Sequence, residues 1–490
     1  MTVQVEKSDD RKLAKVIGLV VGLGLFILFL STPHPSDLSR EAWLVAGVAL
    51  LMAVFWITEA LPLPITAMLP LPIIPMLGVA PLKEITVSYS HPIIFLFVGG
   101  FLVALAMEKW RLHERIALVV LKTFGSKLNR LVGGFAAVTA FLSMWISNTA
   151  TTLMMIPIAL SIIDIVERSH SGSAQSSYKF SCALLLSIAY GASAGGMATL
   201  VGTPPNAFLA GFLKQTHGID IGFSDWIVMA LPLSIVLLGF IWLLLTKVLF
   251  RIGSDSNPEI RDRIGALSKD LGPMCTGEKL TAIFFLLLVI GWVFRPWLAS
   301  HFPNLGLTDT TVAMLIGLSL FLCPVDWRRG KFLMDWEWGK KLPFGILLLF
   351  GGGFALAGLI DSSGLATWIG VKLSVLEQMP HIVIVISMIV LLVLLTEITS
   401  NTATTATFLP IVSALAITLG KDPLLLTVPA ALAASCAFML PVATPPNTII
   451  FSSGRVGVTD MVKVGFVLNL ISVVLITMVS YTLLVWIFLS

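Results

Sequence analysis

Long apolar runs separated by short polar breaks extend over almost the whole chain. A hydrocarbon core about 30 Å thick is crossed by roughly 20 apolar residues of helix. The first run is followed by Ser-Thr-Pro-His-Pro and not by a small-residue cleavage site, so we expect a retained helix instead of a signal peptide. Runs of suitable length predict eleven transmembrane helices, at residues 14–31, 42–60, 64–80, 92–108, 179–212, 226–250, 279–298, 308–324, 343–360, 425–454 and 462–489.

Two further apolar runs, 131–165 and 381–418, are interrupted near their middles by the same polar string, Ser-Asn-Thr-Ala-Thr-Thr. Basic residues distinguish hairpins from crossings, because Lys and Arg gather on the cytoplasmic side of membrane proteins. With a cytoplasmic N-terminus and two re-entrant hairpins, most of the 31 basic residues fall on cytoplasmic segments. The outer side keeps only Arg40, Lys83, Lys214, Arg295, Lys372 and Lys421. We therefore predict two re-entrant hairpins and a C-terminus on the outer side.

The chain also repeats itself. Gly-Gly-Phe at 99 and 352, Ser-Asn-Thr at 147 and 400, and proline at 157 and 410 recur at one constant separation. Thr-Pro-Pro-Asn recurs at 203 and 444, and the polar loop 168–179 can supply the extra residues of the first half. The basic residues place the bases of the two hairpins on opposite sides of the membrane, so the repeats have inverted topology.

We therefore predict a first inverted repeat at 1–250, with hairpin 131–165 and broken helix 179–212. A charged cytoplasmic linker, 251–278, precedes the second repeat at 279–490, with hairpin 381–418 and broken helix 425–454. In transporters built this way, substrate and coupling ions bind near the bilayer midplane, where discontinuous helices of both halves meet.

The repeated motifs indicate the chemistry of such a site. Consecutive prolines remove backbone donors and unwind a helix, which frees carbonyl groups for a cation and N–H groups for an anion. The Ser-Asn-Thr residues cap the second arm of each hairpin, where a helix N-terminus favours an anion. No Lys or Arg lies beside either motif. A buried dianion there must therefore be balanced by cations and dipoles, which predicts a cation-coupled transporter with at least two cation sites.

Other features have weaker implications. Glu397 is ionisable and lies inside a hairpin, which suggests a ligand or a proton relay, yet the equivalent residue in the first half is Met144. The doubled glycines at 99 and 351–353 favour close helix packing over binding. Segments 110–127 and 362–376 mix charged and apolar residues, as helices along a membrane surface do.

Composition excludes a soluble globular protein, because 57% of the residues are hydrophobic, 12% are charged and the mean hydropathy is +0.96. The four cysteines are scattered, without a CxxC pair, and the histidines do not cluster, so nothing indicates metal or redox chemistry. A membrane enzyme would need a nucleophile with its base, paired aspartates or a motif such as HExxH, and the sequence has none of these. A channel fits an inverted repeat with two hairpins less well than alternating access does.

The paired Ser-Asn-Thr motifs, the paired Thr-Pro-Pro-Asn breaks and the eleven-span plan resemble the divalent anion/sodium symporter family, over nearly the whole chain. That family includes bacterial dicarboxylate transporters and the animal dicarboxylate and citrate carriers. The resemblance implies an all-α polytopic protein of a bacterial inner membrane. It further implies a homodimer, in which each protomer has a scaffold domain and a transport domain that moves as an elevator.

The resemblance also implies a set of site residues, with sodium as the coupling ion and no organic cofactor. The first sodium site corresponds to Ser143, Ser147, Asn148 and Gly202, and the second to Thr396, Thr399, Asn401 and Ala443, with backbone oxygens from Thr399 and Ala443. The substrate carboxylates correspond to contacts with Asn148, Thr149, Asn401, Thr402, Thr203, Thr444 and Pro445.

Both hairpin tips keep the complete Ser-Asn-Thr sequence, whereas some animal citrate carriers vary it, and this favours C4 dicarboxylates such as succinate, malate or fumarate. Two alternatives remain at this point. Some bacterial relatives exchange dicarboxylates without sodium, and other members carry citrate, tartrate or sulfate. We expect sodium symport, with no enzymatic activity and no nucleic-acid partner.

Overall fold

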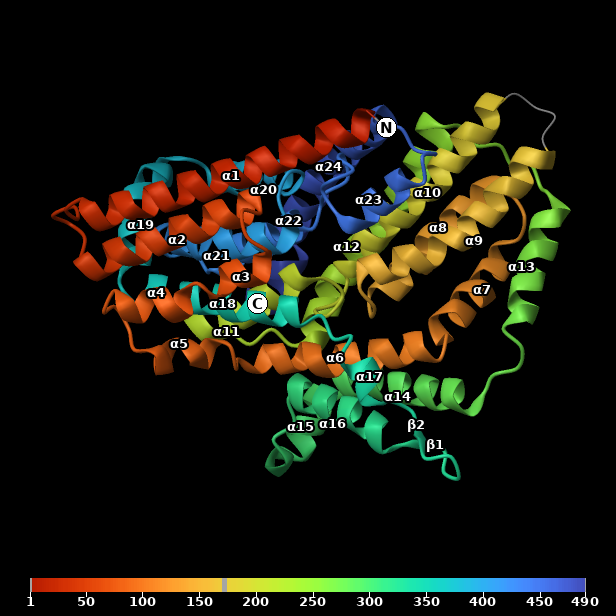
Figure 1. The fold of residues 1–490 in the computed structure, drawn as a ribbon, viewed down its shortest axis with the longest axis horizontal. Helices are drawn as coiled ribbons and strands as arrows, with labels where there is room; N and C mark the ends of the chain where they lie inside the picture. Colours follow the sequence, from red (N-terminus) through yellow and green to blue (C-terminus); the bar gives the residue numbers. More distant parts are fainter. Residues whose placement is uncertain (1, 170–173, 490) are drawn as a thin grey trace.

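A computed structural model describes residues 2–169 and 174–489, and these are almost entirely helical (Figure 1). The middle of the polar loop 168–179 lies outside the described residues. The exception to the helical fold is a short antiparallel strand pair, β1 (Pro324–Asp326) and β2 (Lys331–Phe332). The all-helical architecture predicted from the apolar runs is therefore confirmed.

The N-terminal part contains two long helices followed by a series of shorter ones. The run 64–80, expected to be one span, forms two short helices, and Pro70, Pro72 and Pro75 in this run explain the break because each lacks a backbone donor. The helices are α1 (Thr2–Ser31), α2 (Arg40–Thr58), α3 (Leu63–Met68), α4 (Pro70–Met76), α5 (Leu82–Ser88), α6 (Pro92–Lys109) and α7 (Leu112–Phe124).

The first interrupted run forms two helices that contact each other, and they lie beside a third helix that is buried from Phe180 to Gly196 (Figure 1). These are α8 (Leu128–Ser143), α9 (Asn148–Ser169) and α10 (Ala174–Gly196). The chain leaves the helix after Gly196 and becomes helical again at the Pro204-Pro205 pair. The half ends with α11 (Pro204–His217), α12 (Phe223–Leu243) and a π-helical turn, η1 (Leu244–Leu249).

A middle group of helices follows, and α14, α15 and α16 lie with the strand pair along one edge of the molecule (Figure 1). Its elements are α13 (Pro258–Asp270), α14 (Thr276–Val293), α15 (Arg295–His301), η2 (Pro303–Leu305), α16 (Asp309–Leu322) and α17 (Trp336–Gly339).

The last part has the same order of elements as the first half: a long helix, two helices around a Ser-Asn-Thr tip, and an interrupted helix. The interruption is longer here, because the chain stays non-helical from 435 to 444. The elements are α18 (Phe344–Ser362), α19 (Leu365–Leu373), η3 (Ser374–Gln378), α20 (His381–Thr396), α21 (Asn401–Thr418), α22 (Leu424–Ala434), α23 (Pro445–Ser452), α24 (Val458–Tyr481) and η4 (Val485–Leu489).

Eight helices within the described ranges are long and apolar enough to cross a membrane. The count becomes nine if Leu365–Gln378 and His381–Thr396, which meet at an angle of 119°, form one span. Helix α9 is among the eight, so length alone does not distinguish a hairpin arm from a crossing. The structure thus gives a multi-pass membrane protein, while eleven spans and two hairpins remain a prediction from the basic residues.

Glycines allow several helices to approach one another very closely. A Cβ atom added to Gly99 would lie 2.4 Å from the carbonyl carbon of Ala313, at the contact between α6 and α16. One added to Gly352 would lie 2.0 Å from the carbonyl oxygen of Ala67, between α18 and α3. This agrees with the packing role inferred for the doubled glycines, because only residues without a side chain permit backbones so close.

Candidate functional site

The first Ser-Asn-Thr tip connects α8 to α9 and is held by its own side chains. The hydroxyl of Ser143, the last residue of α8, donates a hydrogen bond of 2.5 Å to Oδ1 of Asn148, the first residue of α9. Ser147 Oγ accepts from the backbone N–H of Ala150 at 3.3 Å, as a helix cap does. The tip thus brings a serine hydroxyl and an amide oxygen together at the start of a helix.

The first break, residues 197–203, packs directly against this tip. Thr199 Oγ1 donates to the carbonyl oxygen of Met144 at 2.6 Å and accepts from the N–H of Gly202 at 3.0 Å. A Cβ on Gly202 would lie 2.5 Å from the carbonyl oxygen of Gly196 and 3.0 Å from that of Ser143. Carbonyl oxygens therefore surround a position that only glycine can occupy.

The amide of Asn206 holds the turns of the first break together. Its Nδ2 lies 3.3, 3.1 and 2.8 Å from the carbonyl oxygens of Gly196, Met197 and Thr199. The side chain is fully buried. Because backbone groups of an interrupted helix must find partners inside the protein, this asparagine stabilises the unwound conformation.

The second tip connects α20 to α21 and repeats this arrangement with threonine in place of serine. Thr396 Oγ1 lies 2.8 Å from Asn401 Oδ1 and 2.7 Å from the carbonyl oxygen of Ala434, the last residue of α22. Thr399 Oγ1 bonds to the carbonyl oxygen of Leu395 at 2.8 Å and to Thr404 Oγ1 at 2.6 Å. A hydroxyl, an amide oxygen and a free helix-end carbonyl therefore converge beside the second break.

Glu397 connects the second tip to the second break. Its Oε1 accepts from the N–H groups of Phe438 and Met439 at 2.8 and 2.9 Å, and its Oε2 accepts from those of Met439 and Leu440, both at 3.0 Å. Asn469 Nδ2, on α24, donates to Oε1 at 2.8 Å. The carboxylate thus takes up N–H groups that the interrupted helix leaves unpaired.

Asn447 has the same role in the second half as Asn206 has in the first. It is fully buried, and its Nδ2 donates to the carbonyl oxygens of Ala437 and Leu440 at 3.2 and 3.0 Å. Its backbone N–H donates to Thr444 Oγ1 at 3.3 Å, and Thr444 is the cap of α23. Both Thr-Pro-Pro-Asn motifs therefore start a helix and close the preceding loop.

The two breaks meet inside the protein. Cys436 Sγ in the second break lies 3.8 Å from Met197 Sδ in the first, and the rings of Tyr190 and Phe438 pack at 5.4 Å. The two halves contact each other through the second arm of each hairpin, because α9 contacts α23 of the second break and α21 contacts α11 of the first break. The four motifs, far apart in the sequence, therefore gather around one region.

The predicted site residues differ in their exposure and in their hydrogen bonds. Thr203, Thr402 and Thr444 are buried, and Thr149 and Asn401 are half-buried. Ser147 and Pro445 are exposed, and the N–H of Ala443 donates to the carbonyl oxygen of Leu440 within its own break. None of the hydrogen bonds among the described residues joins one tip to the other. A substrate held between the two tips is thus a proposal and not an observed contact.

The oxygen groups at both tips suit a sodium ion. Hydroxyl, amide and carbonyl oxygens are hard, uncharged ligands, and such groups at half-helix ends coordinate sodium in broken-helix transporters. At Gly202, where a side chain would collide with two carbonyl oxygens, the absence of a side chain allows those oxygens to lie close to the backbone beside the first tip. At the second tip, the carbonyl oxygen of Ala434 is the corresponding backbone oxygen.

Sequence reasoning missed the amides of Asn206, Asn447 and Asn469, and the carbonyl of Ala434. The first two carried a signal, since both belong to the repeated Thr-Pro-Pro-Asn motif, which we had interpreted only as a break. Asn469 carried none, because it is a single polar residue in the long apolar helix α24. Only the packing of α24 against the break places it beside Glu397.

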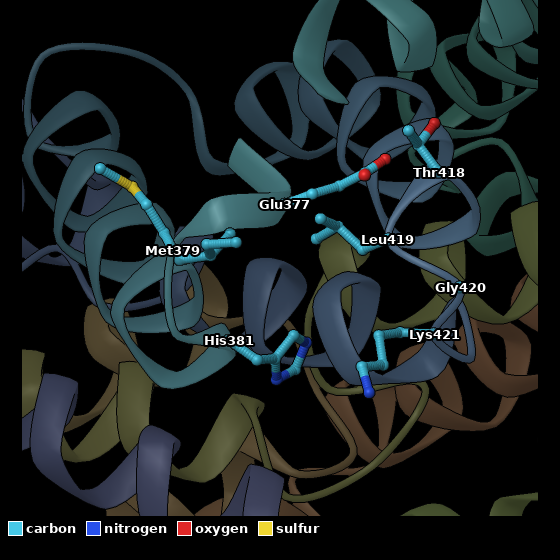
Figure 2. A pocket seen from close by; sticks show the side chains of 8 residues that line it. Glu377, Met379, His381, Thr418, Leu419, Gly420 and Lys421 are labelled. Atoms are coloured by element: carbon cyan, nitrogen blue, oxygen red, sulfur yellow. The ribbon is translucent and has the colours of Figure 1, made fainter. Parts of the chain in front are cut away.

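A cavity of about 370 Å³ lies elsewhere (Figure 2). Its walls come from the end of η3, the start of α20 and the end of α21, and Glu377 extends across it toward Thr418. His381, in its wall, is about 22 Å from Thr396 along α20 at 1.5 Å per residue. This cavity therefore belongs to the base of the second hairpin and not to the site at its tip.

Comparison with known proteins gives close relatives over the full length. The chain is 42% identical over 482 residues to a sodium-dependent dicarboxylate transporter, SdcS, of Staphylococcus saprophyticus, covering 98% of this chain and 93% of the relative. It is 41% identical over 480 residues to SdcS of Staphylococcus aureus, covering 97% and 92%.

Two solved structures share the fold at low sequence identity. The YdaH transporter of Alcanivorax borkumensis is 16% identical with a TM-score of 0.56, covering 92% of this chain and 98% of that one. MtrF of Neisseria gonorrhoeae, described as an antimetabolite efflux pump, is 13% identical with a TM-score of 0.55, covering 97% and 94%. At these identities the likeness concerns the fold alone. The family described as the sodium:sulfate symporter transmembrane region matches residues 11–490, and the chain therefore belongs to this family of divalent anion:sodium symporters, as its paired motifs indicated.

Proposed function

We propose that this protein is a secondary transporter that couples the uptake of C4 dicarboxylates, such as succinate, malate and fumarate, to sodium. The activity is transport and not catalysis, and sodium is the coupling ion, as the names of the SdcS relatives indicate. The observation that carries the proposal is the meeting of the two breaks at Met197 and Cys436, each break packed against its own Ser-Asn-Thr tip.

The site residues have the following roles in this proposal. One sodium ion binds at the first tip to Ser143, Ser147, Asn148 and Gly202, and another at the second tip to Thr396, Thr399, Asn401 and Ala443. The substrate carboxylates lie between the tips, against Asn148, Thr149, Asn401 and Thr402, with Thr203, Thr444 and Pro445 beside them. The positive ends of α9 and α21 and the bound cations offset the charge of the dianion.

The proposed architecture has eleven membrane-crossing helices and two re-entrant hairpins, arranged as two inverted repeats at 1–250 and 279–490. The N-terminus and the linker 251–278 are cytoplasmic, and the C-terminus is outside. Two protomers form a dimer through scaffold domains, and each transport domain moves as an elevator. An excess of sodium over substrate charge allows the membrane potential to assist accumulation, at about 2.3 kcal/mol per charge and 100 mV.

The test is uptake of radiolabelled succinate into proteoliposomes under three conditions: an inward sodium gradient, potassium in place of sodium, and unlabelled succinate inside. We expect uptake only with the sodium gradient. Uptake that needs internal succinate and no sodium would identify an exchanger. If succinate, malate and fumarate all fail to enter while citrate, tartrate or sulfate does, the substrate assignment is wrong and the family assignment stands.

A further inference from the structure

The carboxylate of Glu397 has an unusual environment for an acidic group in an apolar protein. Its side chain is 3% exposed. Both oxygens receive hydrogen bonds only from N–H donors, which is the arrangement expected for an ionised carboxylate. Among the residues that the structure describes, no Lys, Arg or His forms an ion pair with it. The group is thus a buried negative charge held by dipoles, without a counter-ion.

The first half has no such charge. The equivalent residue is Met144, and its backbone carbonyl oxygen accepts a hydrogen bond from Thr199 Oγ1. The first tip is therefore connected to its break by a neutral hydroxyl, and the second by a carboxylate that takes N–H groups of three successive residues. The two halves, alike in their motifs, differ in charge at equivalent positions.

The charge lies immediately beside the proposed second cation site. Glu397 follows Thr396, whose Oγ1 lies within 2.8 Å of both Asn401 Oδ1 and the carbonyl oxygen of Ala434. The carboxylate also fixes Phe438–Leu440, which precede Ala443 in the same break. A buried charge without a counter-ion is costly, and a cation at the neighbouring oxygens would supply that counter-ion.

We propose that Glu397 is the positioning residue that makes the two cation sites unequal. Its fixed charge raises the sodium affinity of the second site, so that this site fills first and without dicarboxylate. The first site, which has no nearby carboxylate of this kind, fills at higher sodium concentration. This inference rests on the proposed function, because it presumes that sodium binds at both tips.

The experiment measures equilibrium binding of radiolabelled sodium to the purified full-length protein without dicarboxylate. The wild-type protein is expected to show one tighter and one weaker site. Glu397→Gln keeps an oxygen acceptor but removes the charge, and it should lower the affinity of the tighter site by roughly tenfold or more. Glu377→Gln makes the same chemical change at an exposed position in η3, just before the same hairpin, and should leave both affinities as in the wild type.

Two further variants separate the charge from the hydrogen bonds. Asn469→Ala removes one donor and keeps the charge, so its tighter site should weaken less than in Glu397→Gln. An equal loss of sodium affinity in both variants would indicate that Glu397 acts only by holding the second break in place, and it would overturn the electrostatic inference. If Glu397→Gln does not fold, Glu397→Asp is measured instead, because it keeps the charge on a shorter side chain. Near-normal affinity in Glu397→Asp supports the inference, and loss of the tighter site contradicts it.

The wild-type result distinguishes this inference from the proposed function. A wild-type protein that neither binds sodium nor takes up dicarboxylate in a sodium gradient contradicts the proposed function. A wild-type protein with two unequal sites, together with a Glu397→Gln variant that binds sodium equally well, contradicts only the role of Glu397.

Discussion

Polar side chains in this protein work in small groups at places where a helix stops. Asn148 and Asn401 each receive a hydrogen bond from a hydroxyl one turn earlier, Ser143 and Thr396 respectively. That bond orients the amide oxygen before any ion arrives, which lowers the ordering cost of binding. Preorganised oxygens therefore explain why the two asparagines occupy equivalent positions in the two halves. An isolated asparagine in an apolar helix would only destabilise the fold.

Replacing either asparagine should lower the apparent affinity of uptake for sodium. Asn148→Ala and Asn401→Ala each remove a proposed oxygen ligand, so we expect roughly tenfold more sodium for half-maximal uptake. Asn148→Ala also leaves the Ser143 hydroxyl without its acceptor, whereas Thr396 keeps the carbonyl oxygen of Ala434. The measurement is succinate uptake by proteoliposomes across a range of sodium concentrations. Asn304→Ala, in the exposed turn η2 that precedes α16, is the matched control. Unchanged sodium dependence in both site variants would remove these residues from the sites.

At the scale of elements, the broken helices are held by close helix packing. Helix α10 lies so near α8 that a Cβ on Gly195 would fall 2.1 Å from the carbonyl oxygen of Ala140 and 2.4 Å from its Cα. One turn earlier, a Cβ on Gly191 would fall 2.7 Å from the carbonyl oxygen of Ala136. Because the first hairpin is pressed against the helix that carries the first break, tip and break hold a fixed relation.

Enlarging Gly195 should separate these two helices. Gly195→Val places a branched side chain against backbone atoms that cannot move aside, and overpacking of this kind costs about 1–3 kcal/mol or more. We expect a lower melting temperature for the purified protein and a lower folded yield, measured by fluorescence-detected size exclusion during heating. Gly24→Val, on α1 where no atom lies within 4 Å, should behave as the wild type does. An unchanged melting temperature in Gly195→Val would mean that α8 and α10 are farther apart than described.

Sequence patterns predicted the elements whose cause is local. The helix interruptions at Thr-Pro-Pro-Asn follow from proline chemistry, and the helix start at Asn148 follows from capping by Ser147. The contacts between halves, of α9 with α23 and of α21 with α11, could not be predicted, because they join residues more than 180 positions apart. The division of 64–80 into α3 and α4 was predictable from its four prolines and was overlooked.

At the scale of the whole molecule, the orientation in the membrane is inferred from the distribution of basic residues and not from the fold. The linker 251–278 and the loop after α16 both carry several Lys and Arg residues, and both are therefore proposed to be cytoplasmic. The hairpin interpretation requires this orientation, since a full crossing at either interrupted run would reverse every later loop. An experimental test of the linker, which follows the first interrupted run and precedes the second, therefore tests the first hairpin as well.

Cys275 offers that test, because it is exposed and lies at the end of the linker, just before α14. In a variant with Cys323→Ser, the two other cysteines, Cys182 and Cys436, are buried and should not react. A membrane-impermeant maleimide should then leave intact cells unlabelled and should label Cys275 only after the membrane is opened. Asn304→Cys in a Cys275→Ser and Cys323→Ser background should give the opposite result, because that loop is proposed to face outside. Labelling of Cys275 in intact cells would place the linker outside, and the first interrupted run, another span before the linker, or the N-terminus would then need to be reassigned.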